Sequence, residues 1–302
     1  MRILSSHDVI TALPYDKLIA ELPVRLRQAT QSPQRTVHAW PHEASLLLMP
    51  AWNDAIGGVK IVNVTPGNAA RGLAAVTASY IVIDAVTGEH LALLDGGELT
   101  ARRTAAVAAV AAARLAIDDA RKLLLVGSGR IASELAFAYR AVRDIREVEI
   151  FSPTAANAER LARHLCQEGF AARACDNLEA AVKAADIIAC ATLSATPLIH
   201  GEWLTAGQHV ALIGGFTHDM READDVAMRR ATVWVDSRAA LYESGDLSGP
   251  IARGALKAED IAGTLAELCA LGAAPGRDEE ITLFKSVGDA AQDLAAAGIA
   301  LG

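Results

Sequence analysis

The stretch L-L-L-V-G-S-G-R-I-A, residues 123–132, joins an apolar run to a turn of the G-x-G-x-x-A type. In such a turn the first glycine permits a tight reversal and the second lets backbone N–H groups approach a pyrophosphate. A small third residue lets the next helix pack on the strand, with its N-terminal dipole facing the phosphates. The stretch therefore predicts a dinucleotide site at Gly127, Gly129 and Ala132, in preference to a purely structural turn.

From residue 121 onward, short apolar runs alternate with helical stretches until about residue 236. This alternation predicts parallel strands joined by helices, a doubly wound Rossmann-type α/β sheet. The expected strands read K-L-L-L-V-G, E-V-E-I-F-S, A-A-R-A-C, D-I-I-A-C-A-T, H-V-A-L-I-G-G and T-V-W-V-D. We therefore expect a dinucleotide-binding domain over residues 119–280.

The residues before the glycine turn have a different pattern. Residues 6–28 are predicted to be helical, and residues 36–94 contain short strand-like runs between turn residues, typical of an antiparallel sheet. Thr100 is predicted to cap an Ala-rich helix. The tail reads as a strand or turn followed by a helix, and we expect it to return to this first region. We therefore expect an α+β substrate-binding and dimerisation domain formed by residues 1–118 and 281–302.

Composition excludes several function classes. The chain has 302 residues, 52% of them hydrophobic and 21% charged, with a formal net charge of -8. An acidic chain without a basic stripe is a poor partner for nucleic acid or an anionic membrane surface. Its four cysteines are scattered without metal-ligand spacing, so no metal is expected. The N-terminus lacks the apolar core of a signal peptide, which predicts a cytoplasmic protein.

The end of the second expected parallel strand, I-F-S-P-T, bears on the choice of cofactor. NAD sites usually place an acid there to bind the ribose hydroxyls. Here Glu149 lies inside the strand, whereas Ser152 and Thr154 offer neutral hydroxyls that tolerate a 2′-phosphate. This favours NADPH and leaves NADH open. Arg130 and Arg160 are nearby cations that either help bind the phosphate or are solvated helix residues.

Further cofactor contacts are expected around the turn and at the fourth strand. We expect Thr104, Ser128 and Ile131 to contribute together with Arg130. Thr192 follows the fourth expected strand, where a doubly wound sheet contacts its ligand. The alternative for Thr192 is that it only caps a helix.

Two cations ahead of the glycine turn are candidates for binding a substrate anion. Lys60 stands in the apolar run G-G-V-K-I-V-N-V, where a buried lysine is costly unless it meets an anion. It could equally point outward from a half-exposed strand. Arg103 lies near the start of the Ala-rich helix, where a cation opposes the helix dipole. Its guanidinium fork suits a carboxylate.

Several motifs together identify a family resemblance. They are Q-R-T-V at 34–37, M-P-A at 49–51, G-V-K-I-V at 58–62, L-T-A-R-R-T-A-A at 99–106, the glycine turn, A-T-L-S-A-T-P-L at 191–198 and F-K-S-V-G at 284–288. In this order they resemble the ornithine cyclodeaminase/mu-crystallin family over nearly the whole chain. The resemblance implies that Arg35, Lys60 and Arg103 bind a substrate carboxylate and that Ser286 and Gly288 contact the cofactor. It also implies a homodimer, assembled through the N-terminal segment and the returning tail.

The family includes two chemistries that one position separates. The resemblance implies that ornithine cyclodeaminases of this family have an Asp soon after a Gly at the end of the fifth cofactor-domain strand. This chain has Phe216 at that position. Asp219, three residues later, is not an obvious substitute. The stretch G-G-F-T-H-D-M-R-E instead resembles the family's reductases of cyclic ketimine acids, with His218 where those often have Pro. The resemblance thus implies reduction of Δ1-pyrroline-2-carboxylate or Δ1-piperideine-2-carboxylate to L-proline or L-pipecolate.

In this interpretation Lys60 supplies the proton, directly or through water, provided that burial lowers its pKa toward neutrality. Three alternatives remain at this point. They are an ornithine cyclodeaminase, an alanine dehydrogenase-like oxidoreductase, and a mu-crystallin-like protein that binds NADPH or a small ligand without significant turnover.

Overall fold

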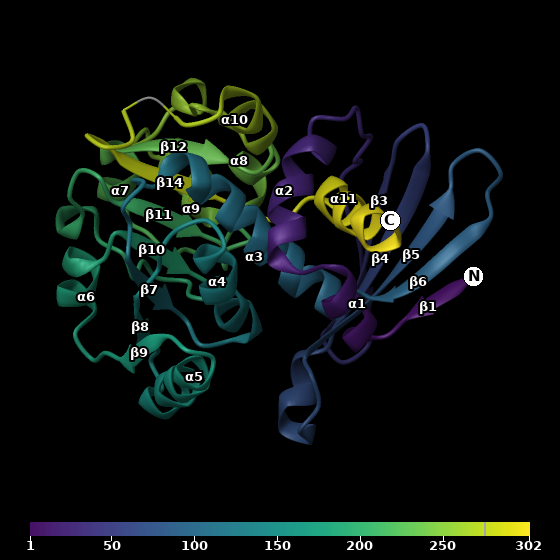
Figure 1. Ribbon diagram of the computed structural model, residues 1–302, viewed down its shortest axis with the longest axis horizontal. Helices are drawn as coiled ribbons and strands as arrows, with labels where there is room; N and C mark the ends of the chain where they lie inside the picture. The colour runs from purple at the N-terminus through teal and green to yellow at the C-terminus, as the bar shows by residue number, and fades with distance from the viewer. Residues whose placement is uncertain (275) are drawn as a thin grey trace. The chain divides into compact units, whose positions relative to one another are not determined.

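The computed structural model describes residues 1–274 and 276–302 (Figure 1). Contacts divide the chain into two compact units, one of residues 1–103 with 289–302 and the other of residues 104–288. Each unit is built on one sheet, with six strands in the first and eight in the second.

The second unit contains the predicted doubly wound parallel sheet, and the predicted fold class is confirmed. Its strand order is β13-β12-β14-β11-β10-β7-β8-β9, and each pair of neighbouring strands is parallel. The strands are β7 (Lys122–Val126), β8 (Glu147–Phe151), β9 (Ala171–Ala174), β10 (Ile187–Cys190), β11 (His209–Leu212), β12 (Ala231–Val235), β13 (Gly263–Thr264) and β14 (Ile281–Lys285). The central strands β10, β11 and β14 are buried along their whole length, as expected for the largely apolar strands of a parallel sheet.

Helices connect these strands and cover the sheet. The helices are α4 (Arg130–Arg140), α5 (Ala155–Gln167), α6 (Leu178–Ala184), α7 (Asp225–Arg230), α8 (Ala240–Glu243), α9 (Gly245–Ala252) and α10 (Leu265–Leu271), with short 3-10 turns η2 (Gly201–Trp203) and η3 (Ala258–Asp260). Helix α4 packs on β7 and β10, and α5 packs on β8 and β9. The carboxyl ends of the parallel strands therefore form one edge, where loops present the functional side chains.

The observed unit boundaries differ from the expected domain boundaries at residues 118/119 and 280/281. Strand β14 pairs with β11 and β12 inside the eight-stranded sheet, so the tail rejoins the first unit only from Asp289. At the other boundary, α3 (Gly96–Leu115) begins in the first unit and enters the second at Thr104. An apolar strand has the same sequence pattern in either sheet, and only its long-range pairing assigns it.

The first unit contains a mixed six-stranded sheet of order β1-β6-β5-β4-β3-β2. Its strands are β1 (Arg2–Leu4), β2 (Thr36–Trp40), β3 (Ala44–Trp52), β4 (Ile56–Val64), β5 (Val76–Asp84) and β6 (His90–Asp95). The predicted antiparallel pairing holds from β2 to β6, while β1 pairs with β6 in parallel. One 3-10 turn, η1 (Pro66–Arg71), joins β4 to β5.

Helices cover this sheet on one face, with α11 (Ala290–Leu301) against β3 and β4 (Figure 1). The predicted single helix over residues 6–28 is two helices, α1 (Ser6–Ala12) and α2 (Tyr15–Arg25). Pro14 lies between them, where a residue without an N–H starts a new helix.

The predicted cap of α3 is wrong. The helix starts at Gly96, and the N–H of Glu98 donates to Asp95 Oδ1 at 2.7 Å, whereas the Thr100 hydroxyl donates back to the Gly96 carbonyl at 2.7 Å. Within the described part of the chain, no helix has the length and apolar character needed to cross a membrane.

Candidate active site

The glycine turn has the geometry that its sequence predicts. Gly127 follows β7 with a φ of 113°, and a Cβ placed there would lie 2.5 Å from the Ala191 carbonyl oxygen. Only glycine satisfies both conditions. Gly129 is the N-cap of α4 and makes no side-chain cap hydrogen bond, and a Cβ on it would meet no atom within 4 Å. Open space before an uncapped helix N-terminus fits a pyrophosphate.

The hydroxyls predicted beside this turn lie at the end of β8. The Ser128 hydroxyl donates to Ser152 Oγ at 3.1 Å, which joins two of the predicted cofactor residues. Thr154 is the N-cap residue of α5, but its side chain makes no cap hydrogen bond. Glu149 forms an ion pair with Arg173 inside the sheet and is not at the strand end. The end of β8 thus presents hydroxyls without an acid, as the sequence indicates.

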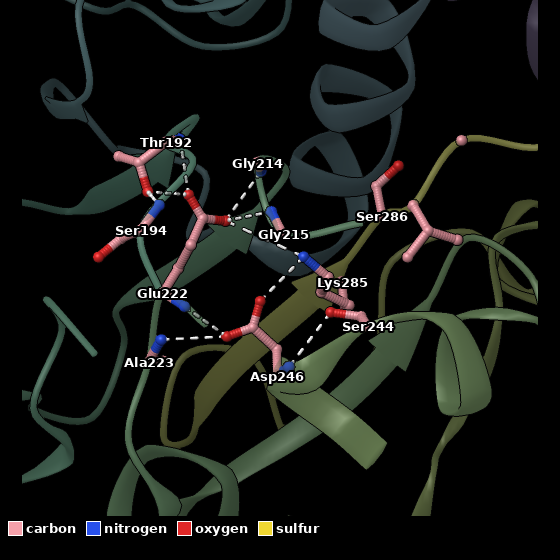
Figure 2. Close-up of polar contacts among 12 residues, drawn as sticks. Thr192, Ser194, Gly214, Gly215, Glu222, Ala223, Ser244, Asp246, Lys285 and Ser286 are labelled. Atoms are coloured by element: carbon pink, nitrogen blue, oxygen red, sulfur yellow. Dashed lines mark hydrogen bonds and ion pairs between the residues drawn. The ribbon is translucent and has the colours of Figure 1, made fainter. Parts of the chain in front are cut away.

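Thr192 lies in the loop after β10 and caps no helix, so that alternative is wrong. Its N–H donates to Glu222 Oε1 at 2.7 Å, and its hydroxyl donates to the same oxygen at 2.9 Å. The other carboxylate oxygen of Glu222 accepts the N–H groups of Gly214 at 2.8 Å and Gly215 at 3.3 Å. One buried carboxylate therefore joins the ends of β10 and β11 (Figure 2).

Glu222 belongs to a fully buried charged cluster with Asp246 and Lys285 (Figure 2). Lys285 Nζ lies 3.0 Å from Asp246 Oδ2 and 3.9 Å from Glu222 Oε2. Asp246 Oδ1 accepts the N–H groups of Glu222 at 2.7 Å and Ala223 at 3.1 Å. Burial raises the pKa of Glu222, and the positive charge of Lys285 only partly offsets this effect. Lys285 comes from β14, so the cluster fixes the ends of three strands.

The F-K-S-V-G turn is organised by an acid that the sequence analysis did not select. Asp236 Oδ2 accepts the Ser286 hydroxyl at 2.8 Å, the Val287 N–H at 3.0 Å and the Gly288 N–H at 2.8 Å. Ser286 and Gly288 are both buried. The two predicted cofactor residues are thus brought together by Asp236 at the end of β12.

The first unit brings two of the three predicted carboxylate-binding cations, Lys60 and Arg103, together on Asp293 of α11. Lys60 Nζ lies 2.8 Å from Asp293 Oδ2, and Arg103 Nε donates to Asp293 Oδ1 at 2.7 Å. Arg103 Nη1 also donates to Gln292 Oε1 at 2.9 Å. Lys60 is 3% exposed, so the outward-facing alternative is wrong. The buried Lys60 thus meets an anion, the carboxylate of Asp293 in the same chain.

Electrostatics in this cluster follow from its burial. Burial lowers the pKa of Lys60 to about 8; the charges of Arg103 and Arg35 act in the same direction, and Asp293 opposes them. Burial alone would raise the pKa of Asp293, but Arg103 and Lys60 outweigh that effect and hold it below its ordinary value. Arg35 is close enough to act on Lys60 electrostatically. The pKa of Lys60 is therefore lowered in the direction that the expected proton-donor role calls for.

The remaining predicted positions lie as follows. Thr104 is buried on α3, and Arg130 and Ile131 are the first two residues of α4. Phe216, in the loop after β11, is 40% exposed. His218 Nδ1 lies 3.4 Å from Ser248 Oγ in the same region.

Four buried acids were not predicted, because nothing in the sequence near them shows which distant donors they meet. They are Glu222, Asp236, Asp246 and Asp293. A signal existed for Asp293, since it is the only acid in the apolar run A-A-Q-D-L-A-A-A. An acid in an apolar stretch, like Lys60 in its apolar strand, is costly to bury unless it meets an opposite charge.

Comparison with known proteins decides the family. Residues 3–300 match the model of the ornithine cyclodeaminase/mu-crystallin family. The chain belongs to this family. The predicted resemblance is therefore confirmed over almost the full length of the chain.

Individual members of the ornithine cyclodeaminase/mu-crystallin family agree with the reductase branch. The chain is 41% identical to a Δ1-pyrroline-2-carboxylate reductase of Paracoccus denitrificans over 278 residues, which is 89% of this chain and 87% of that protein. It is 35% identical to the ketimine reductase mu-crystallin of Mus musculus over 259 residues, 85% of this chain and 79% of that protein.

Among solved structures, the Δ1-pyrroline-2-carboxylate reductase of Thermococcus litoralis, in complex with NADH and L-proline, superposes with a TM-score of 0.93 at 30% identity. The match covers 99% of this chain and 96% of that one. The predicted enzyme class, an imine reductase, agrees with these relatives.

Proposed function

We propose that this protein uses NAD(P)H to reduce cyclic ketimine carboxylates, Δ1-pyrroline-2-carboxylate and Δ1-piperideine-2-carboxylate, to L-proline and L-pipecolate. The observation that supports this most is the buried Lys60–Arg103–Asp293 cluster. Its two cations face one internal carboxylate, which leaves one positive charge for a substrate carboxylate. The names of the family's reductases and the L-proline bound to the Thermococcus litoralis enzyme point the same way.

Arg103 would orient the substrate. Its Nε and Nη1 are already bonded to Asp293 and Gln292, while Nη2 makes no hydrogen bond to a described residue. The guanidinium plane is therefore preset before a substrate carboxylate binds, which lowers the entropic cost of the reactive geometry. Lys60, beside it, would bind the same carboxylate and hold the proton that the imine nitrogen needs. When bound, the reduced nicotinamide supplies the hydride to the imine carbon.

An assay of NADPH oxidation with a panel of substrates tests the proposal. The panel contains both cyclic ketimine acids, the unsubstituted ring imine Δ1-pyrroline, and pyruvate with ammonia. We expect oxidation with the two ketimine acids and formation of the L-amino acid, identified by chiral chromatography. Oxidation with pyruvate and ammonia alone would instead support an alanine dehydrogenase. Binding of NADPH without turnover of any substrate would support a ligand-binding protein.

We propose NADPH as the preferred cofactor, with NADH also accepted. Ser152 at the end of β8, paired with Ser128, offers hydroxyls where an acid would repel a 2′-phosphate. The substitution Ser152→Asp should raise the Kd for NADPH at least tenfold while changing that for NADH little, and Ser152→Ala serves as its control. An unchanged ratio of the two constants in Ser152→Asp would contradict the assignment of this strand end.

Cyclodeamination of ornithine is disfavoured by Phe216, which is 40% exposed in the loop where cyclodeaminases are expected to have Asp. Incubation with ornithine and catalytic NAD+ should therefore release no ammonia. Ammonia release at a rate comparable with ketimine reduction would overturn this preference.

We also propose that the protein is a homodimer formed through the six-stranded sheet. Strand β2 is an edge strand whose five residues are all exposed, including Val37 and Trp40. Trp52, at the end of the neighbouring strand β3, is exposed as well. Exposed apolar residues on a sheet edge are typical of an interface. Light scattering coupled to size exclusion should give twice the chain mass, and Trp40→Glu should shift it to one chain mass.

A further inference from the structure

The order of strands indicates which side of the sheet would hold the nicotinamide. In the second unit β10 and β8 lie on opposite sides of β7, whose glycine turn fits the pyrophosphate. In a doubly wound sheet the adenosine half follows the strand that carries the ribose-binding position, here β8. The nicotinamide half is then on the side of β10 and β11. The inference below rests on the dinucleotide cofactor of the proposed function.

Thr192 follows the end of β10, and its hydrogen bonds determine whether its hydroxyl can donate to a ligand or only accept from it. A hydroxyl has one proton and two acceptor positions. The Thr192 proton is donated to Glu222 Oε1 at 2.9 Å, and one acceptor position receives the Ser194 N–H at 3.3 Å (Figure 2). One acceptor position remains. Toward a ligand, Thr192 Oγ1 can therefore only accept.

Glu222 enforces this orientation because every group hydrogen-bonded to its carboxylate is a donor. Its two oxygens accept three backbone N–H groups and the Thr192 hydroxyl. Lys285 adds a positive charge 3.9 Å from Oε2. The side chain is fully buried, so no water competes for these positions. The Thr192 hydroxyl would have to abandon a buried carboxylate in order to donate elsewhere, which is costly.

We propose that Thr192 Oγ1 accepts a hydrogen bond from the carboxamide NH2 of the nicotinamide, and that Glu222 is the positioning residue that keeps this oxygen an acceptor. The carboxamide carries two N–H donors. A pyridine ring with an acetyl group in place of the carboxamide has no donor at this position. Thr192 thereby distinguishes the two rings. Glu222 contributes through Thr192 and does not itself touch the cofactor.

The test compares dissociation constants for three oxidised probes, measured by titration calorimetry. They are NADP+, its 3-acetylpyridine analogue, and 2′-phospho-ADP-ribose, which lacks the ring altogether. One neutral hydrogen bond should make the wild type prefer NADP+ over the analogue by roughly fivefold. The isosteric Thr192→Val should lose this preference, and Thr192→Ser, which keeps the hydroxyl, should retain it. Binding of 2′-phospho-ADP-ribose should be the same in all three proteins.

Glu222→Gln replaces an acceptor by an amide that also donates, and we expect it to lose the preference as Thr192→Val does. Unchanged binding of 2′-phospho-ADP-ribose separates this positioning role from general damage to the sheet. Should Glu222→Gln not fold, Thr192→Val still decides. A wild-type ratio of NADP+ to analogue binding in Thr192→Val overturns the proposal. These constants are independent of ketimine turnover, so failure of the proposed reaction is recognised separately by the substrate panel.

Discussion

Lys60 and Asp293 form a buried ion pair, with Nζ 2.8 Å from Oδ2, and they come from opposite ends of the chain. Asp293 is fully buried in the first turns of α11, where the helix dipole favours a negative charge. The same carboxylate binds Arg103. Because both cations contact this one anion, Asp293 fixes the positions of the residues proposed to hold the substrate, and its charge opposes the lowering of the Lys60 pKa by burial.

The substitution Asp293→Asn tests this dependence. Asn keeps an acceptor for Arg103 but removes the counter-charge, and loss of one partner of a buried ion pair costs about 3 kcal/mol or more. We expect the free energy of unfolding in urea to fall by that order. The same change at the exposed Asp54 should alter it by less than about 0.5 kcal/mol. Equal stabilities for the two variants would contradict the structural role of Asp293.

Lys60 should give the reaction an alkaline limb. Its pKa is lowered to about 8 by burial, so the proton-donating form is lost as the pH rises above that value. A plot of log kcat/KM should be level below about pH 8 and then fall. Lys60→Arg cannot titrate in this range and should show no such limb, although its rate will be lower. A limb that persists at the same pH in Lys60→Arg belongs to the substrate and would remove Lys60 from the proton supply.

The same shift predicts how Lys60 affects stability. The folded pKa of about 8 lies below the ordinary value of 10.5, so the unfolded chain binds more protons between these values. The cost of burying the charged lysine is fully present below pH 8 and is relieved as the pH rises toward 10.5. The stability of the wild type relative to Lys60→Met should therefore increase over this window, as followed by urea unfolding. A difference that decreases with pH has the wrong sign for a buried lysine.

Arg103→Ala should raise KM for a ketimine acid about tenfold or more, since hydrogen bonds between charged groups contribute about 1.5–3 kcal/mol. The unsubstituted imine Δ1-pyrroline has no carboxylate and is the matched control. Wild type should prefer the acid strongly, and Arg103→Ala should discriminate far less in kcat/KM. If the variant retains the full preference, Arg103 does not bind the carboxylate.

Two glycines of the turn should respond differently to the same added methyl group. Gly127→Ala must adopt a φ of 113° and place Cβ 2.5 Å from the Ala191 oxygen, so its free energy of unfolding should fall by about 2 kcal/mol or more. Gly129→Ala meets no atom within 4 Å and should lose no more than about 1 kcal/mol. It should nevertheless weaken NADPH binding, because the methyl group occupies the space that fits the pyrophosphate. Tight NADPH binding by Gly129→Ala would place the pyrophosphate elsewhere.

Much of the second unit could be predicted from the sequence because its signals are local. The turn at residues 127–132 requires glycine at its first position because the backbone there adopts a φ of 113°, a conformation set within the turn itself. The apolar runs before and after it read as buried strands because both faces of a parallel sheet are covered. In the first unit, Lys60 could be predicted as an anion-binding residue, since a charge in an apolar strand is costly wherever the strand lies.

Only the tertiary structure decided how distant segments combine. It placed β14 between β11 and β12, and it brought Asp293 onto Lys60 and Arg103 and Glu222 onto Thr192. Acids in helices and loops look the same in sequence whether they face water or a buried donor. Strand neighbours and ion-pair partners are set by long-range packing, whereas turns, caps and apolar periodicity are set within a few residues.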